Sequence, residues 1–305
     1  MNSKVGFLIS SWTQHPSSLN VSSDTVCGSW KVKGQRLRGL TRTLERLIHE
    51  PSLYRAALRS QKKKSKKVQA GRQMYQASQR YLGTRVHRDI AMLCRKTTTP
   101  DRVHPIAMRL WSFFTAQKRW IPVASEFKVW DERHKTTTAI DAIFIDPETA
   151  RLIAIEWKTG YEDDHIYTFR QGTLCLGDAR LPKSIAYAHQ LQLALGCAML
   201  PKSHPGLSVD KMYVARVTRQ RNVSTQQSVE LLPVEPAVRR IVDLSYDLLL
   251  GGKSKPANTH TLSRGGKRVP VTSLQPRLRT PRVRVPGARS KKTKRSGIQR
   301  GGAKK

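Results

Sequence analysis

The sequence predicts an α/β protein, with a mixed β-sheet core flanked by helices and basic, disordered extensions. Three strand-like segments follow one another near the middle of the chain, and helical patterns lie on both sides of them. Basic residues without acidic counterparts concentrate towards the two ends. These observations divide the chain into a basic N-terminal extension with a helical segment (1–70), a folded domain (71–250) and a basic tail (251–305).

The three central segments have the composition of β-strands. Val123–Trp130 alternates loosely between apolar and polar residues, Ala139–Ile145 is rich in β-branched residues, and Leu152–Trp157 is a short apolar run. The turn-prone stretches DERHKTT and DPET separate them. Because both connections are short, the sequence predicts a three-stranded meander.

The remaining elements follow from apolar periodicity and from punctuation by proline and glycine. We expect helices over residues 36–58 with a break near Pro51, then 74–96, 105–118, 184–200 ending before Pro201, and 236–250, and further strands over 212–217 and 229–232. The apolar stripe of the helix at 105–118 is expected to pack in the core. Beyond residue 250 the composition cannot form a core, so this tail is expected to be disordered.

The charge of the chain is strongly uneven. The formal net charge is +35. Residues 1–80 hold 16 basic and 3 acidic residues, residues 251–305 hold 17 basic residues and none acidic, and residues 81–250 are nearly balanced. Such arms favour a polyanionic partner, with nucleic acid as the first candidate and an acidic membrane surface as the rival. No apolar run approaches the roughly 18–20 residues that span a bilayer, so we expect no membrane partner.

Several acidic residues fall on the predicted strands. Asp141 lies in the middle of the second strand, Glu126 near the start of the first, and Glu156 and Lys158 lie on one face of the third because side chains alternate. Ionised carboxylates in a sheet require a partner or a metal. The acids with Lys158 therefore predict a divalent-cation site, and the alternative, which stays open mainly for Glu126, is a solvent-facing polar position.

This pattern resembles the PD-(D/E)xK nuclease signature, with Asp141 on one strand followed by Glu156-Trp157-Lys158 on the next. Upstream, Gly83-Thr-Arg-Val-His87 resembles the GxxxH helix of the RecB-type exonuclease branch. Downstream, the helix with Gln190 resembles the glutamine helix of that branch, although Ala194 stands where the family often has tyrosine. The resemblance covers roughly residues 81–200.

The resemblance implies a Mg²⁺- or Mn²⁺-dependent deoxyribonuclease, most simply an exonuclease acting on DNA ends. It implies that Asp141 and Glu156, with the Trp157 carbonyl, hold one cation and that His87 binds or assists a second. Lys158 would activate the attacking water, and Gln190 would position water or phosphate. Glu126 would be a metal ligand or would orient a metal-bound water.

Other interpretations stay open at this stage. They are a structure-specific endonuclease on the same fold, a non-catalytic basic nucleic-acid-binding protein, and a packaging protein; RNA is not excluded as the substrate. The four cysteines lack zinc-ligand spacing and the cluster typical of iron–sulfur nucleases, and no GxxxxGK[ST] loop is present, so we expect neither an iron–sulfur cluster nor ATP.

The expected compartment is intracellular. The basic run at 61–67 resembles a nuclear-import signal, which favours the nucleus, or the host nucleus for a virus or mobile element. A mitochondrial address is less favoured, because no arginine precedes Arg36.

Overall fold

The computed structural model describes residues 21–24, 29–32, 34–60, 81–159, 164–176, 178–219 and 227–251. All of them belong to one compact unit, residues 1–257. The predictions for residues 1–20, for the basic run at 61–67 and for the tail after Gly251 lie outside the described residues.

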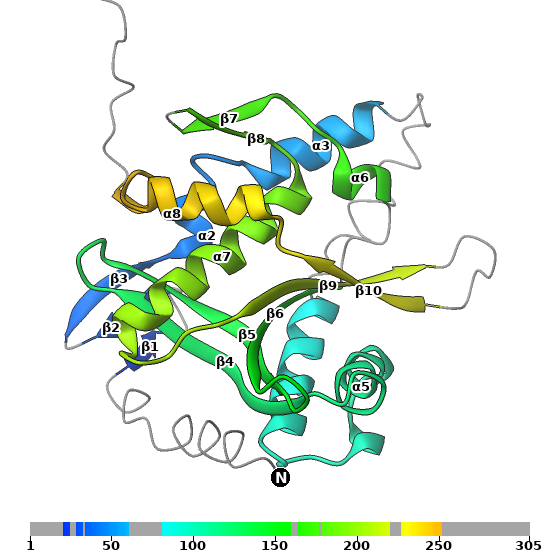
Figure 1. The fold of residues 1–305 in the computed structure, drawn as a ribbon. Helices are drawn as coiled ribbons and strands as arrows, with labels where there is room; N and C mark the ends of the chain where they lie inside the picture. Colours follow the sequence, from blue (N-terminus) through cyan, green and yellow to red (C-terminus); the bar gives the residue numbers. More distant parts are fainter. Residues whose placement is uncertain are drawn as a thin grey trace, which may run out of the picture. The chain divides into compact units, whose positions relative to one another are not determined.

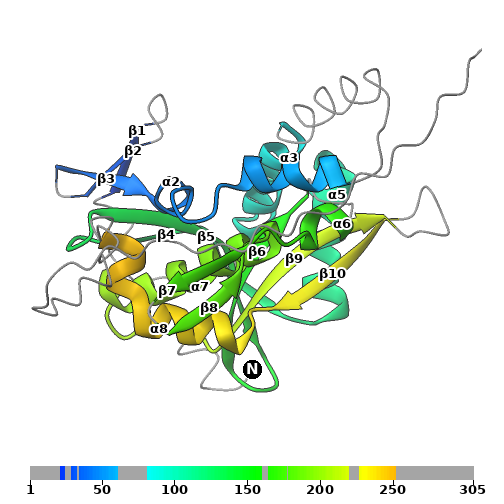
Figure 2. The same cartoon turned by 90° about the horizontal axis from the view of Figure 1, so that it is seen from above.

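One sheet organises this unit. Its strands follow the order β1-β2-β3-β5-β6-β9-β10, and β4 pairs with β5. Figure 1 shows helices covering this sheet, and Figure 2 shows β4, β5, β6, β9 and β10 in succession across it. The strands are β1 (Val21–Asp24), β2 (Ser29–Val32), β3 (Gln35–Gly39), β4 (Ile121–Asp131), β5 (Thr136–Asp146), β6 (Arg151–Lys158), β9 (Lys211–Arg219) and β10 (Gln227–Pro233). A separate hairpin joins β7 (Thr173–Leu176) to β8 (Ala179–Pro182).

The predicted meander is confirmed. β4 pairs antiparallel with β5, and β5 pairs antiparallel with β6. β9 then pairs parallel with β6, and β3 pairs parallel with the start of β5. The architecture is therefore an α/β fold with a mixed sheet, as the sequence predicts.

Each face of the sheet packs against its own helices. Described helices are α2 (Leu40–Leu44), α3 (Glu50–Ser60), residues 81–94, η2 (Pro100–Arg102), α5 (Pro105–Ser112), the π-helical turn η3 (Phe113–Gln117), α6 (Asp164–Thr168), α7 (Ile185–Ser203) and α8 (Pro236–Gly251). The larger hydrophobic cluster joins α2, α3, α7 and α8 to one face, and a second cluster joins the helix of 81–94, α5 and η3 to the other. Alternation along β6 explains this division, because Leu152 and Ala154 face the first cluster and Ile153 and Ile155 the second.

Two helix boundaries differ from the prediction, and one predicted break is confirmed. Residues 36–39 are strand rather than helix, because Arg38 and Gly39 pair with Thr136 and Thr137 of β5. The break near Pro51 is present, since α2 ends at Leu44 and α3 begins at Glu50; Pro51 itself lies in the first turn of α3, where its missing N–H costs nothing. α7 continues past Pro201 to Ser203.

The residues of 34–60 share the main core of the sheet. Leu40, Leu44 and Ile48 are buried with Leu53 and Ala57 of α3 in the larger hydrophobic cluster. The sequence prediction placed this range in an extension preceding the folded domain. In the structure, this range packs into the same core as the sheet that carries the candidate site.

A polar cluster fixes α8 to the turn between β4 and β5. α8 bends at Ser245 (φ −128°, ψ 19°), and the Tyr246 hydroxyl donates a hydrogen bond to Asp131 Oδ2 (2.9 Å). The His134 backbone and ring also bond to Asp131, each at 3.0 Å. Burial opposes ionisation of Asp131, but these hydrogen bonds outweigh it and lower its pKa to about 2.

Candidate metal centre and cleft

The candidate site lies at a gap along one edge of β5. On that edge β3 pairs with Thr136 and Thr137, and β6 pairs with residues 142–146. Among the described residues, no strand pairs with the stretch between them, which ends at Asp141. The Trp157 N–H takes no part in the β5–β6 ladder and instead donates a hydrogen bond to Asp141 Oδ2 (2.9 Å). The backbone thus fixes one carboxylate oxygen of Asp141 and leaves the other turned to its neighbours.

The end of β6 supplies the second acid and the lysine. Glu156 and Lys158 share one face, and the Lys158 Nζ donates to Glu156 Oε1 (2.6 Å). Trp157 points to the opposite face, where it is buried in the second hydrophobic cluster. The alternation predicted from the sequence is therefore confirmed. Gln192 of α7 also donates to Glu156 Oε1 (2.7 Å), so two donors hold one oxygen of this carboxylate.

Glu126 and His87 approach Asp141 from two other elements. Glu126 has a left-handed backbone (φ 49°) that interrupts the regular β4–β5 ladder between Ser125 and Phe127. Such a conformation is costly for a residue with a side chain, and it occurs where the surrounding structure fixes it. His87 comes from the helix of 81–94. Gly83, one turn earlier, lets this helix come close to the sheet, since a Cβ there would lie 3.3 Å from Thr159 Oγ1.

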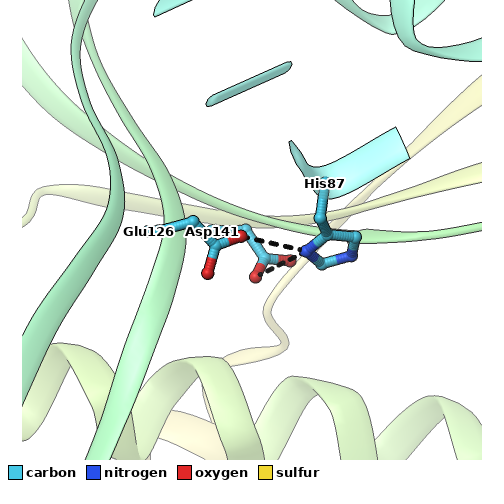
Figure 3. A group of neighbouring side chains, drawn as sticks. All are labelled: His87, Glu126 and Asp141. Carbon is cyan, nitrogen blue, oxygen red and sulfur yellow. Dashed lines mark hydrogen bonds and ion pairs between the residues drawn. The ribbon is translucent and has the colours of Figure 1, made fainter. Parts of the chain in front are cut away.

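These three side chains form a compact group of potential metal ligands (Figure 3). His87 Nδ1 lies 3.2 Å from Glu126 Oε1 and 3.4 Å from Asp141 Oδ1. One ligand atom from each residue lies within 4.8 Å of the others. The structure thus brings His87, Glu126 and Asp141 together from a helix and two strands that are well separated in the sequence.

The electrostatics of the group reflect crowded negative charge. Burial raises the pKa of Asp141, and the neighbouring Glu156 carboxylate raises it further. Burial alone would lower the pKa of His87, but Asp141 and Glu126 outweigh burial and raise it. The pKa of Lys158 is likewise raised, because Glu156 and Asp141 outweigh the effect of burial. Additional positive charge at this point would therefore stabilise the ionised carboxylates.

The donor set fits a divalent cation. Carboxylate oxygens with one imidazole, completed by water and phosphate oxygens, are ligands that Mg²⁺ and Mn²⁺ accept. His87, Glu126 and Asp141 would hold the ion, with Glu156 beside them.

Two members of the group, His87 and Glu126, line a cleft of about 950 Å³. Part of the lining between the walls is formed by Glu126, Trp157, Lys158 and Thr159. α2 and α3 contribute one wall, and the helix of 81–94 contributes another. A cleft of this size can admit an extended ligand to His87, Glu126 and Lys158.

Gln190 is not brought to this site. Its side-chain oxygen accepts the N–H of Glu235 (2.9 Å), which ties α7 to the start of α8. Because α7 has 3.6 residues per turn, His189 and Gln192 share the cleft face, and Gln190 faces the core. The structure therefore does not bring Gln190 to the acids, and the glutamine in contact with Glu156 is Gln192.

The contribution of α3 to the site was not predicted from the sequence. Glu50, Tyr54 and Arg55 of α3 line the cleft, and Glu50 lies 3.5 Å from His189 Nε2. The polar pair His189 and Gln192, one turn apart in an otherwise apolar helix, is a sequence signal for the cleft face of α7. No local signal identifies α3, because its place depends on tertiary packing.

Within the described part of the chain, no helix is long and apolar enough to cross a membrane. A scan against protein-family models found no match, and a search of the curated proteins found no similar sequence.

Proposed function

We propose that this chain is a divalent-metal-dependent deoxyribonuclease of the PD-(D/E)xK type, and that it degrades DNA from its ends by phosphodiester hydrolysis. One observation carries the proposal: the His87, Glu126 and Asp141 ligand group lies beside the Glu156–Lys158 pair, and His87, Glu126 and Lys158 line a cleft. The mixed sheet with helices on both faces is the architecture that the sequence resemblance implies.

Each residue has a definite task in this proposal. Asp141 is oriented by the Trp157 N–H, so its free oxygen is preorganised as a ligand. His87 and Glu126 complete the ligand group. A bound divalent cation would supply Lewis-acid stabilisation of the phosphate and a more acidic water.

Lys158 supplies a positive charge from a side chain of the protein. Its ammonium, held by Glu156, lies where it can orient the attacking water and offset charge that develops on the phosphate. Gln192 shares the same oxygen of Glu156 and so limits the rotation of that carboxylate. The basic residues near both chain ends would bind the DNA backbone without reading its sequence.

The experiment that tests this function is a time course on four DNA forms. Linear, nicked and covalently closed relaxed plasmid, with a matching single strand, are incubated with purified protein in Mg²⁺ and in EDTA. We expect loss of linear DNA in Mg²⁺ only, and little cutting of the closed circle. Discrete fragments from the closed circle would replace the exonuclease by an endonuclease, and stable DNA in every form with Mg²⁺ or Mn²⁺ would refute hydrolysis altogether.

A further inference from the structure

A buried arginine lies next to Lys158 but has no task in the proposed reaction. Arg216 of β9 is in register with Lys158 of β6 and is 2% exposed. Because paired residues of neighbouring strands point to the same face, the Arg216 side chain lies on the face that carries Lys158. A buried guanidinium requires opposite charge and hydrogen-bond acceptors around it. The partners of Arg216 therefore show which elements it connects.

Arg216 pairs with acids from two different elements. Its guanidinium forms ion pairs with Asp164, in the first turn of α6, and with Glu230 of β10, which also accepts a hydrogen bond from Arg216 Nε (2.9 Å). The same guanidinium lies over the ring of Tyr167 of α6, 4.5 Å from the ring centroid. The contacts with Asp164 and Tyr167 thus fasten α6 to the sheet, whereas the contact with Glu230 stays within the sheet.

α6 in turn contacts both ends of α3. Both ribbon views show the two helices side by side (Figures 1 and 2). At the C-terminal end of α3, Ser60 Oγ lies 2.8 Å from His165 Nε2. At its N-terminal end, Glu50 lies 3.5 Å from His189 Nε2, and His189 Nδ1 lies 3.4 Å from the Tyr167 hydroxyl. A helix of 5 residues therefore connects both ends of a cleft wall to the sheet.

The two helices depend on these contacts to different degrees. α6 is far too short to be stable through its own backbone hydrogen bonds, so tertiary contacts must fix it. Ile166 and Tyr167 supply its buried apolar surface, and Arg216 supplies its charged contact. α3 has buried residues of its own, Leu53 and Ala57, in the larger hydrophobic cluster. Loss of the Arg216 contacts is therefore expected to release α6 and to loosen α3 without unfolding it.

We propose that Arg216 is a positioning residue for the cleft: it fixes α6 to the sheet, and α6 holds α3 in place as a cleft wall. The wall residues that depend on it are Glu50, Tyr54 and Arg55. The effect of this positioning on a substrate rests on the proposed nuclease function. The position and mobility of α3 do not, and they are tested first.

The two acids provide a matched pair of variants. Asp164→Asn and Glu230→Gln each remove one charged partner of Arg216, but only Asp164 belongs to α6. Arg216→Met removes the guanidinium, and Arg216→Lys keeps a positive charge. Lys211→Met is the control, because it removes another cation of β9 and its ion pair with Asp146, about 16 Å along the strand.

The measurement is amide hydrogen exchange of the full chain, followed by mass spectrometry. In Asp164→Asn and Arg216→Met, the amides of α6 should exchange about 10-fold faster or more, and those of α3 several-fold faster, with α5 unchanged. Arg216→Lys should recover part of the protection. Glu230→Gln and Lys211→Met should alter neither α6 nor α3.

The two acid variants decide the test even if Arg216→Met does not fold, because both carboxylates are partly exposed and their removal leaves the guanidinium one partner. Equal effects of Asp164→Asn and Glu230→Gln on α6 would overturn the inference. Faster exchange in α6 without any change in α3 would overturn it as well.

Digestion of linear DNA in Mg²⁺ separates this inference from the proposed function. Asp164→Asn should raise KM several-fold with little change in kcat, because the wall is loosened while the Glu156–Lys158 pair is untouched. An unchanged KM in a variant with a loosened α3 would overturn the inference and leave the nuclease function standing. If the exchange pattern is found but the wild type degrades no DNA, the positioning of α3 by Arg216 stands and the nuclease function fails.

Discussion

The two glutamines of α7 give a sharp test of the site, because sequence and structure assign them opposite roles. Gln192→Leu removes the 2.7 Å hydrogen bond to Glu156 Oε1 and leaves that oxygen to Lys158 alone. A hydrogen bond to a charged group contributes about 1.5–3 kcal/mol, and losing a residue that orients a metal-site carboxylate typically costs about 10–100-fold in activity. We therefore expect kcat to fall by about 10–100-fold with little change in Tm.

Gln190→Leu should have the reverse effect. It leaves the N–H of Glu235 without its 2.9 Å partner, which costs about 1–3 kcal/mol when such a group is buried. Tm should fall by about 2–4 °C for each kcal/mol lost in a domain of this size, while activity per folded molecule is retained. The assay is single-turnover hydrolysis at room temperature beside thermal melting of both variants. Loss of kcat in Gln190→Leu at unchanged Tm, with an active Gln192→Leu, would refute the assignment of the cleft face.

Two further predictions concern stability and affinity. The pKa of Asp131 is lowered to about 2, so its ionised form stabilises the fold above about pH 4, and this contribution is lost as the pH falls towards 2. The Tm difference between wild type and Asp131→Asn should therefore shrink between pH 6 and pH 3. A constant difference would contradict the role given to the hydrogen bonds from Tyr246 and His134. Removal of residues 252–305 should weaken duplex binding and lower its log–log salt slope by about 0.9 for each lost phosphate contact, whereas an unchanged slope would show that the basic tail serves another purpose.

Much of the central sheet could be predicted from local pattern. The alternation in residues 123–130, the β-branched run at 139–145 and the turn residues between the strands specify β4, β5 and β6, because strand character and tight turns depend on near neighbours. The spacing of Asp141, Glu156 and Lys158 was sufficient to place all three near one point. His87 could be associated with them only through the sequence resemblance.

The rest depends on contacts that no local pattern contains. Residues 36–39 have a helical period, yet they pair with β5, and this pairing leaves the gap at Asp141. The distinction between Gln190 and Gln192 depends on which face of α7 packs against α8. α3 forms a wall of the cleft because Leu53 and Ala57 are buried against the main core. The basic character of residues 1–70 gives no local sign of this burial.

Asp141 gives the most direct test of the proposed reaction. Asp141→Asn keeps an acceptor for the Trp157 N–H but removes the charge that would hold a cation, so fold and DNA binding should survive. The measurement is the release of nucleotides from linear DNA in Mg²⁺, with Tm and affinity for DNA measured on the same samples. We predict release by the wild type, none in EDTA, and a loss of at least about 100-fold in the variant at near-equal Tm. Release at the wild-type rate by folded Asp141→Asn protein would contradict the proposal that this group of ligands carries the reaction.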